Sequence, residues 1–353
     1  GYEYLAHSLA PATTPDREPR LQIGGPECAE PYASSRLNIS AMSFGALSPQ
    51  AVEALNAGAQ RGGFAHNTGE GSVSPYHRVH GGDLIWQIGT GYFGCRTVDG
   101  GFDPDGFAAT ATTNQVKMIE VKLSQGAKPG HGGILPGPKV SPEIAATRGV
   151  PVGQTVVSPP VHRTFDDPIG LLQFVSQLRE LSGGKPVGFK LCVGRRHEFL
   201  AIARAMLETG QTPDFITVDG GEGGTGAAPL ELSDFVGMPM RDAVHFVDST
   251  LRGAGLRDRV RVLAAGKVAT GMDMVRALAL GADGTNAARS MMLALGCIQS
   301  RRCHDNTCPV GVATQDPGRA RGLVVENKAQ RVAAYHQETV EAFLQLTASM
   351  GCV

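Results

Sequence analysis

The sequence has 353 residues, of which 42% are hydrophobic and 18% charged, with a formal net charge of −1. A nearly neutral chain with 6% aromatic residues offers no electrostatic basis for binding nucleic acid or an anionic membrane, and few rings on which bases could stack. The apolar content permits a large core, and α/β barrels commonly reach this length as a single domain.

Short β-branched runs alternate with amphipathic segments along most of the chain. Residues 37–43, 118–123, 153–157, 187–193, 215–218, 261–265 and 284–288 are predicted as strands, and residues 49–60, 169–181, 198–208, 241–251 and 272–280 as helices. Ser48 before Pro49, and Asp167 before Pro168, are typical helix N-caps. Alternation of this kind predicts an α/β fold, and seven or eight units favour a (β/α)8 TIM barrel over an open doubly wound sheet.

The predicted barrel covers residues 36–326. A Pro-rich, irregular N-terminal arm precedes it at residues 1–35, and a helical extension with one or two helices follows at residues 327–353. No apolar run approaches the 18 residues of a membrane span. The seven cysteines do not have the pattern of a secreted disulfide framework, so a reducing, cytoplasmic setting is expected. The chain begins at Gly1 instead of Met, which leaves an upstream segment or membrane anchor open.

Three cysteines lie close together at residues 297–308, a loop that ends in a proline. Cys297, Cys303 and Cys308 have the spacing C-x5-C-x4-C, with Pro309 directly after the last of them. Three thiolates can converge on one iron–sulfur cluster, and a proline after the last ligand recurs in such runs. A zinc site would need a fourth ligand, for which His304 is at hand. The alternatives to a cluster are therefore zinc, or three structural thiols without a metal.

Glycine-rich motifs follow three of the predicted strands, at the face where TIM barrels place their active sites. They lie at residues 219–226, 264–267 and 284–289. Glycines allow backbone N–H groups to approach an anion, and Arg289 could clamp a phosphate with two hydrogen bonds. The sequence therefore predicts a phosphate-bearing cofactor at this face, and a flexible loop is the alternative for residues 219–226.

A fourth strand-end loop, at residues 122–133, carries two lysines, an amide and an imidazole among four glycines. Lys190 lies within an apolar strand. A lysine there either extends outward to solvent or points into the barrel, where it needs an anionic partner such as the polar edge of a flavin.

Six motifs in order resemble the FMN-binding synthase domain of glutamate synthases, over residues 34–315. The motifs are AMSFGALSP (41–49), NTGEG (67–71), QIGTG (87–91), QGAKPG (125–130), GGTGA (223–227) and CHDNTCPVGVA (303–313). The resemblance implies a barrel with FMN at its mouth and a [3Fe-4S] cluster that passes electrons to the flavin. It also implies reduction of 2-iminoglutarate to glutamate.

The resemblance assigns the cluster to Cys297, Cys303 and Cys308, and contact with the flavin to Lys190. With the polar residues of the loop at 122–133, the predicted catalytic residues are Lys190, His131, Lys128 and Gln125. The FMN-binding residues are Ala41, Met42, Ser43, Lys190, Asp219, Gly223, Gly224, Thr225, Gly266, Lys267, Ala288 and Arg289.

The chain departs from the family pattern at three points. His131 stands where the family has a catalytic Glu, and an imidazole can titrate near neutrality. The amidotransferase domain with its N-terminal cysteine nucleophile and the glycine-rich solenoid domain are missing from this chain, so glutamine hydrolysis by the chain alone is not expected.

The sequence therefore predicts an FMN- and iron–sulfur-dependent oxidoreductase acting on the C=N or C–N bond of an amino or imino acid. Expected partners are the substrate, an electron donor such as ferredoxin or a reductase subunit, and either further copies of the chain or a separate amidotransferase subunit. Two alternatives stay open: an electron-transfer flavoprotein subunit without its own substrate, and a flavin dehydrogenase of hydroxy acids.

Overall fold

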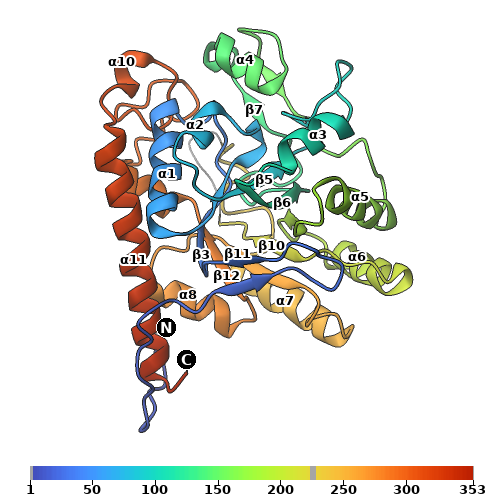
Figure 1. The fold of residues 1–353 in the computed structure, drawn as a ribbon, viewed down its shortest axis with the longest axis vertical. Coiled ribbons are helices and arrows are strands. Elements are labelled where there is room, and N and C mark those ends of the chain that lie inside the picture. Colours follow the sequence, from blue (N-terminus) through green and yellow to red (C-terminus); the bar gives the residue numbers. More distant parts are fainter. Residues whose placement is uncertain (1–2, 223–227, 353) are drawn as a thin grey trace.

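The computed structural model describes residues 3–222 and 228–352, and at its centre eight parallel strands close into a barrel (Figure 1). In order around the barrel these are β3 (Leu37–Ile39), β4 (His66–Asn67), β5 (Leu84–Ile88), β6 (Val116–Lys122), β9 (Val187–Leu191), β10 (Phe215–Asp219), β11 (Arg261–Ala265) and β12 (Gly284–Ala287). Every neighbouring pair is parallel, and β12 returns to β3. The predicted (β/α)8 fold is confirmed.

Helices surround this barrel (Figure 1). They are α1 (Pro49–Gly62), α2 (Pro75–Arg78), α3 (Pro104–Ala111), α4 (Pro142–Arg148), α5 (Pro168–Leu181), α6 (Arg196–Thr209), α7 (Met240–Gly253), α8 (Gly271–Ala279), α9 (Arg289–Leu295), α10 (Pro317–Ala320) and α11 (Val325–Ser349). Both predicted N-caps are confirmed, since Ser48 accepts from the N–H of Ala51 and Asp167 from the N–H of Gly170. A cap of this kind contributes about 1 kcal/mol.

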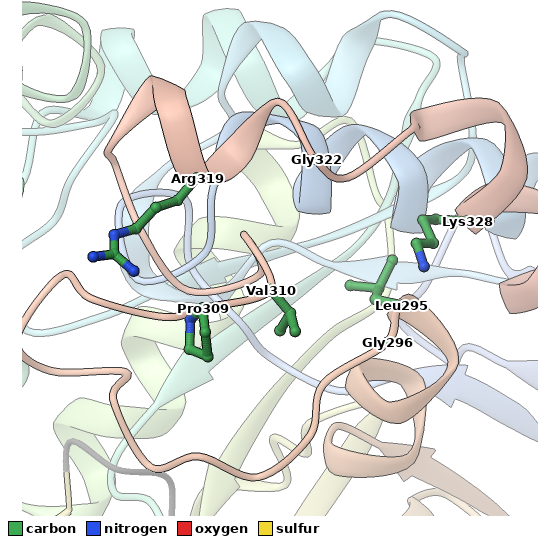
Figure 2. A pocket seen from close by; sticks show the side chains of 7 residues that line it. All are labelled: Leu295, Gly296, Pro309, Val310, Arg319, Gly322 and Lys328. Carbon is green, nitrogen blue, oxygen red and sulfur yellow. The ribbon is translucent and has the colours of Figure 1, made fainter.

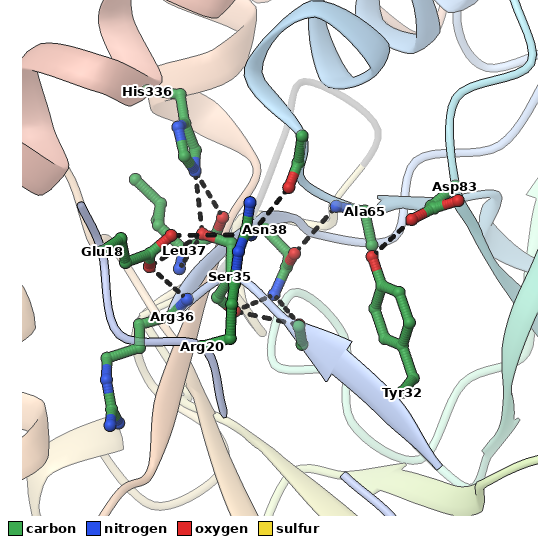
Figure 3. A network of polar contacts seen from close by, with 12 residues as sticks. Glu18, Arg20, Tyr32, Ser35, Arg36, Leu37, Asn38, Ala65, Asp83 and His336 are labelled. Carbon is green, nitrogen blue, oxygen red and sulfur yellow. Dashed lines mark hydrogen bonds and ion pairs between the residues drawn. The ribbon is translucent and has the colours of Figure 1, made fainter. Parts of the chain in front are cut away.

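The predicted C-terminal extension is one long helix, α11, which packs against α1, α8 and α9 along one side of the molecule (Figure 1). His336 joins it to the start of the barrel (Figure 3). Its Nε2 lies 3.0 Å from the carbonyl oxygen of Leu37 and 3.0 Å from Oγ of Ser35, and its ring stacks on Phe64. The helix is thus fixed to the first barrel strand by a buried polar contact.

The N-terminal arm is not irregular throughout, which corrects the sequence-based expectation. β1 (Leu21–Ile23) and β2 (Tyr32–Ser34) form an antiparallel hairpin. Leu21 and Ile23 pack in one apolar cluster with side chains from the amino-terminal ends of the barrel strands, namely Ala65, Ile85, Met118, Phe215 and Leu263. The hairpin therefore covers the end of the barrel opposite to the predicted active site.

The prediction of a barrel strand at residues 153–157 is wrong. Val156–Val157 forms β8, which pairs antiparallel with β7 (Ile134–Leu135) in a two-stranded sheet separate from the barrel. Two barrel strands, β4 and β5, are missing from the sequence-based strand prediction. Along the described part of the chain, no helix is both long and apolar enough to cross a membrane.

Candidate active site

A buried polar network lies inside the barrel on the strands that lead to its carboxyl-terminal mouth. Glu120 of β6 is 1% exposed. It accepts hydrogen bonds from the side-chain nitrogens of Asn67 at 2.8 Å and Gln87 at 2.7 Å, and from the Thr217 hydroxyl at 2.6 Å. Four strands thus contribute to one network, and its satisfied bonds make a rigid floor for the site.

Two ion pairs lie above this floor, at the ends of the strands. Lys122 Nζ is 3.1 Å from Glu70, and Lys190 Nζ is 3.6 Å from Asp219. Lys122 and Lys190 are register partners on neighbouring strands β6 and β9, and both are buried. Lys190 therefore points inward, as predicted, and its partner within the chain is Asp219.

The charged groups at this mouth shift one another's pKa. Burial lowers the pKa of Lys122, and the charge of Lys190 lowers it further, while Glu70 acts in the opposite direction. Burial would raise the pKa of Glu70, but Lys122, followed by Arg148 and Lys128, outweighs it, so the pKa lies below its ordinary value. Glu70 is consequently a carboxylate near neutral pH, surrounded by cations.

The loop after β6 closes over the ion pairs. The N–H of Gly126 donates to Asp219 at 2.9 Å, and a Cβ at this glycine would lie 1.8 Å from the carbonyl oxygen of Gly220, so only glycine fits. Nε2 of Gln125 is buried and finds no acceptor among the described residues. An unpartnered buried amide at a strand end is typical of a site that receives a ligand.

Two further residues of this loop were predicted to be catalytic. Lys128 is 8% exposed, and burial together with the charge of Lys122 lowers its pKa, while Glu70 opposes the shift. His131 is exposed at the surface of the loop, and its N–H lies 3.3 Å from the carbonyl oxygen of Lys128. Lys128 thus belongs to the charged group at the mouth, whereas His131 lies at its rim.

The loop after β3 carries the predicted flavin-lining residues Ala41, Met42 and Ser43, all half-buried. Arg148 of α4 reaches this loop, where its Nη2 donates to the carbonyl oxygen of Phe44 at 2.7 Å and lies 3.4 Å from the Ser43 hydroxyl. Burial lowers the pKa of Arg148 to about 10. Arg148 therefore holds this loop in place from α4, the helix between β7 and β8.

The predicted phosphate residues follow β11 and β12. Gly266 has φ +150°, and Lys267 has φ +52°, a left-handed conformation that costs energy for a residue with a side chain. Lys267 Nζ lies 3.0 Å from Asp234. Ala288 and Arg289 stand at the start of α9. Gly223, Gly224 and Thr225 lie outside the described residues.

The three clustered cysteines lie on the segment after α9. Cys308 is buried, Cys297 and Cys303 are half-buried, and all three are free thiols. Burial raises the pKa of Cys297, and the nearby thiols of Cys303 and Cys308 raise it further. Within residues 3–222 and 228–352, no group of three His, Cys, Asp or Glu side chains is arranged to hold a metal ion. The thiols are therefore neighbours without forming a single-ion site.

A pocket of about 240 Å³ adjoins this cysteine segment (Figure 2). It is lined by Leu295 and Gly296 just before Cys297, and by Pro309 and Val310 just after Cys308. Arg319 and Lys328 lie at opposite ends of the pocket, and Gly322 completes the lining (Figure 2). A small hollow flanked by two cations thus lies beside the two ends of the cysteine segment.

Sequence reasoning did not assign roles to four charged residues that the structure brings to these sites: Glu70, Lys122, Arg148 and Lys139. A signal existed for Glu70 and Lys122, because Glu70 lies in the NTGEG motif just beyond β4 and Lys122 is the last residue of β6. Lys139 gave no such signal. Its Nζ donates to the carbonyl oxygens of Ala46, Cys303 and Ala313, and it is 2% exposed.

A family model described as a conserved region in glutamate synthase matches residues 14–353. The chain belongs to this glutamate synthase family. Among its relatives, the glutamate synthase large subunit-like protein YerD of Bacillus subtilis is 44% identical over 331 residues, which are 93% of this chain and 63% of YerD. The archaeal glutamate synthase (NADPH) of Archaeoglobus fulgidus is 36% identical over 313 residues, 88% of this chain and 58% of that protein. This glutamate synthase family chain therefore spans about three fifths of these relatives.

Solved structures of mandelate oxidase share the fold. A variant with a monooxide FMN adduct gives a TM-score of 0.54 at 17% identity, covering 99% of this chain and 82% of that protein. The complex with (S)-2-phenylpropionate gives a TM-score of 0.56 at 16% identity, covering 99% and 81%. At this level of identity the likeness establishes the barrel architecture alone.

Proposed function

We propose that this chain is an FMN- and iron–sulfur-dependent oxidoreductase of the glutamate synthase type, acting on the C=N or C–N bond of an amino or imino acid. One observation carries the proposal. Three buried lysines, Lys122, Lys128 and Lys190, gather with Glu70 and Asp219 at the mouth of a closed barrel. Charged side chains are rarely buried to this depth, and several that converge at the mouth of a barrel are candidates for binding an anionic ligand or for catalysis.

FMN fits the residues at this mouth. The unpartnered Nε2 of Gln125 can donate to a flavin carbonyl, and Lys190 can place its ammonium beside the edge of the ring that gains negative charge on reduction. The half-buried backbone of Ala41, Met42 and Ser43 would line the ring. The phosphate would be held by Gly223, Gly224, Thr225, Gly266, Lys267, Ala288 and Arg289. When bound, FMN supplies a carrier for a hydride.

The remaining groups at the mouth fit an acidic substrate. Lys128 can attract a substrate carboxylate, with Lys122 and Glu70 fixing the electrostatic potential around it. His131, at the rim, is the proposed proton donor to the substrate carbon or nitrogen, a role that needs a pKa near the working pH. A substrate bearing a carboxylate and an imine would meet a cation on one side and a proton donor on the other.

The cysteine segment offers the ligand set of a [3Fe-4S] cluster. Cys297, Cys303 and Cys308 are three neighbouring free thiols, and iron–sulfur clusters are held by cysteine thiolates. These three residues would hold the cluster, which supplies one-electron transfer toward the flavin.

An acidic redox protein fits the surface beside this segment as the electron donor. Residues 296–331 carry six basic and three acidic side chains, in a chain whose net charge is −1. The pocket between Arg319 and Lys328 can receive a carboxylate of the donor, which would bring it next to the cysteines (Figure 2). A donor of the ferredoxin kind or an acidic reductase subunit matches this chemistry.

A substrate screen tests the proposed reaction. The flavin is photoreduced anaerobically, and its reoxidation is followed on adding 2-oxo acids with ammonia or with methylamine. Reoxidation that needs both components supports the proposal, and Lys128→Met should weaken it, whereas Lys117→Met, a change at a half-buried lysine near the amino-terminal end of β6, should not. Reoxidation by 2-oxo acids alone would indicate hydroxy-acid chemistry instead. No reoxidation by any pair, with a donor protein still reducing the flavin, would favour an electron-transfer subunit.

A further inference from the structure

Lys139 is a buried cation that the proposed reaction leaves unexplained. It ends the short helix η2 (Gly137–Lys139) after the β7 strand, and its side chain is almost completely buried. Its three N–H groups are matched by three backbone carbonyls, those of Ala46 at 2.9 Å, Cys303 at 3.1 Å and Ala313 at 3.3 Å. The hydrogen bonds are satisfied, but carbonyls carry no net charge.

A buried ammonium normally has an anionic partner, because an isolated charge is costly away from water. No carboxylate of the described residues forms an ion pair with Lys139. Lys139 Nζ instead lies against the cysteine segment, where it donates to the carbonyl oxygens of Cys303 at 3.1 Å and Ala313 at 3.3 Å. The negative charge that would balance Lys139 therefore belongs where the proposed cluster ligands lie.

The position of Lys139 also joins two loops. Ala46 belongs to the loop after β3, which carries the proposed flavin-lining residues, while Cys303 and Ala313 belong to the cysteine segment. The same two segments meet again where Gln315 Nε2 donates to the carbonyl oxygen of Leu47 at 2.7 Å. Lys139 is the charged member of this junction between the two proposed redox sites.

We infer that Lys139 is a positioning residue for the proposed cluster: its ammonium group is the counter-charge of the thiolate-bound iron and holds the cysteine segment against the loop after β3. The inference rests on the proposed function, since it needs a cluster on Cys297, Cys303 and Cys308. A three-iron cluster with three thiolates carries net negative charge and becomes more negative on reduction. A fixed cation beside it therefore favours the reduced form.

The test is a redox titration of the cluster, followed by electron paramagnetic resonance, in wild type, Lys139→Met and Lys139→Gln. Lys139→Gln retains a donor for the carbonyls and so gives a second neutral variant if Lys139→Met does not fold. Lys185→Met is the matched control, because Lys185 is 6% exposed and donates to the carbonyl oxygens of Ala111 at 2.7 Å and Thr113 at 2.8 Å, with no cysteine as partner.

Both neutral variants should lower the midpoint potential, so that the ratio of reduced to oxidised cluster at a fixed potential falls on the order of tenfold. Lys185→Met should leave the ratio unchanged. Loss of iron from both neutral variants, with FMN retained and iron kept in Lys185→Met, also supports the inference. An unchanged potential in a neutral variant that keeps its iron would overturn it. Wild-type protein without iron and acid-labile sulfide would refute the cluster itself, a result seen before any variant is measured.

Discussion

Acidification should destabilise this protein well above the pH range in which carboxylates titrate, because several histidines are buried in the neutral form. Burial lowers the pKa of His66 from 6.5 to about 3, and those of His162 and His336 from 6.5 to about 4. In the unfolded chain these side chains take up protons below pH 6.5, whereas in the folded chain they do not. Stability is therefore full above that pH and falls as the pH drops toward the folded pKa values.

The size of the effect follows from the pKa differences. Between pH 7.5 and pH 5 each of the three histidines removes about 2 kcal/mol from the free energy of unfolding, so together they remove about 6 kcal/mol. A domain of ordinary stability has roughly 5–15 kcal/mol in total. The protein should consequently lose a large part of its stability over this interval.

Urea unfolding followed by the fluorescence of Trp86, the single tryptophan and fully buried, measures this directly. His336→Gln removes one titrating group and should reduce the pH-dependent loss by about 2 kcal/mol. His197→Gln, at an exposed position, should leave the loss unchanged. Equal free energies of unfolding at the two pH values in the wild type, or an unchanged loss in His336→Gln, would refute the reasoning.

Substitutions at three positions probe the mouth of the barrel. Lys190→Met leaves Asp219 without its counter-ion, so it should lower the free energy of unfolding by about 3–5 kcal/mol and disfavour the reduced flavin. The flavin potential is measured by dye-coupled reduction, and an unaltered potential would mean that Lys190 is not part of the flavin site. His131→Gln should slow turnover on the order of a hundredfold with FMN content intact. If His131→Glu synthesises glutamate, residue 131 determines substrate specificity instead. Full activity in both variants would leave His131 without a catalytic role. Gly126→Ala places a methyl group against the carbonyl oxygen of Gly220 and should weaken FMN binding about tenfold or more, as measured by flavin fluorescence titration. Wild-type affinity for FMN in this variant would mean that the loop does not form the flavin site.

The fold and six of its barrel strands could be predicted from the sequence because strand and helix patterns alternate, but two barrel strands were missed and one run was wrongly placed in the barrel. Val156–Val157 and Leu84–Ile88 are both short and rich in apolar side chains, and periodicity does not say with which neighbour such a run pairs. β4 has only two residues, His66 and Asn67, which is too short for any pattern. The pairing of β7 with β8 outside the barrel depends on tertiary contacts, which a local sequence pattern does not contain.

Part of the candidate site could also be predicted from the sequence. Lys190 stood out because a lysine inside an apolar strand needs a partner, and the structure supplies Asp219. The pairing of Lys122 with Glu70 depends on loops 52 residues apart in the sequence, so no local pattern contains it. The sequence around Lys139 contains no recognisable motif. Its role can be inferred only from the three backbone carbonyls, from distant segments, that accept its hydrogen bonds.

The cofactor content of the purified protein tests the central claim most directly. Protein prepared without oxygen should release FMN on denaturation and contain about three irons per chain with acid-labile sulfide, as three thiolate ligands imply. Cys303→Ser should lose the iron and retain FMN, since the proposed flavin residues lie on other loops. Zinc without sulfide, or protein that neither contains nor binds FMN, would contradict the account.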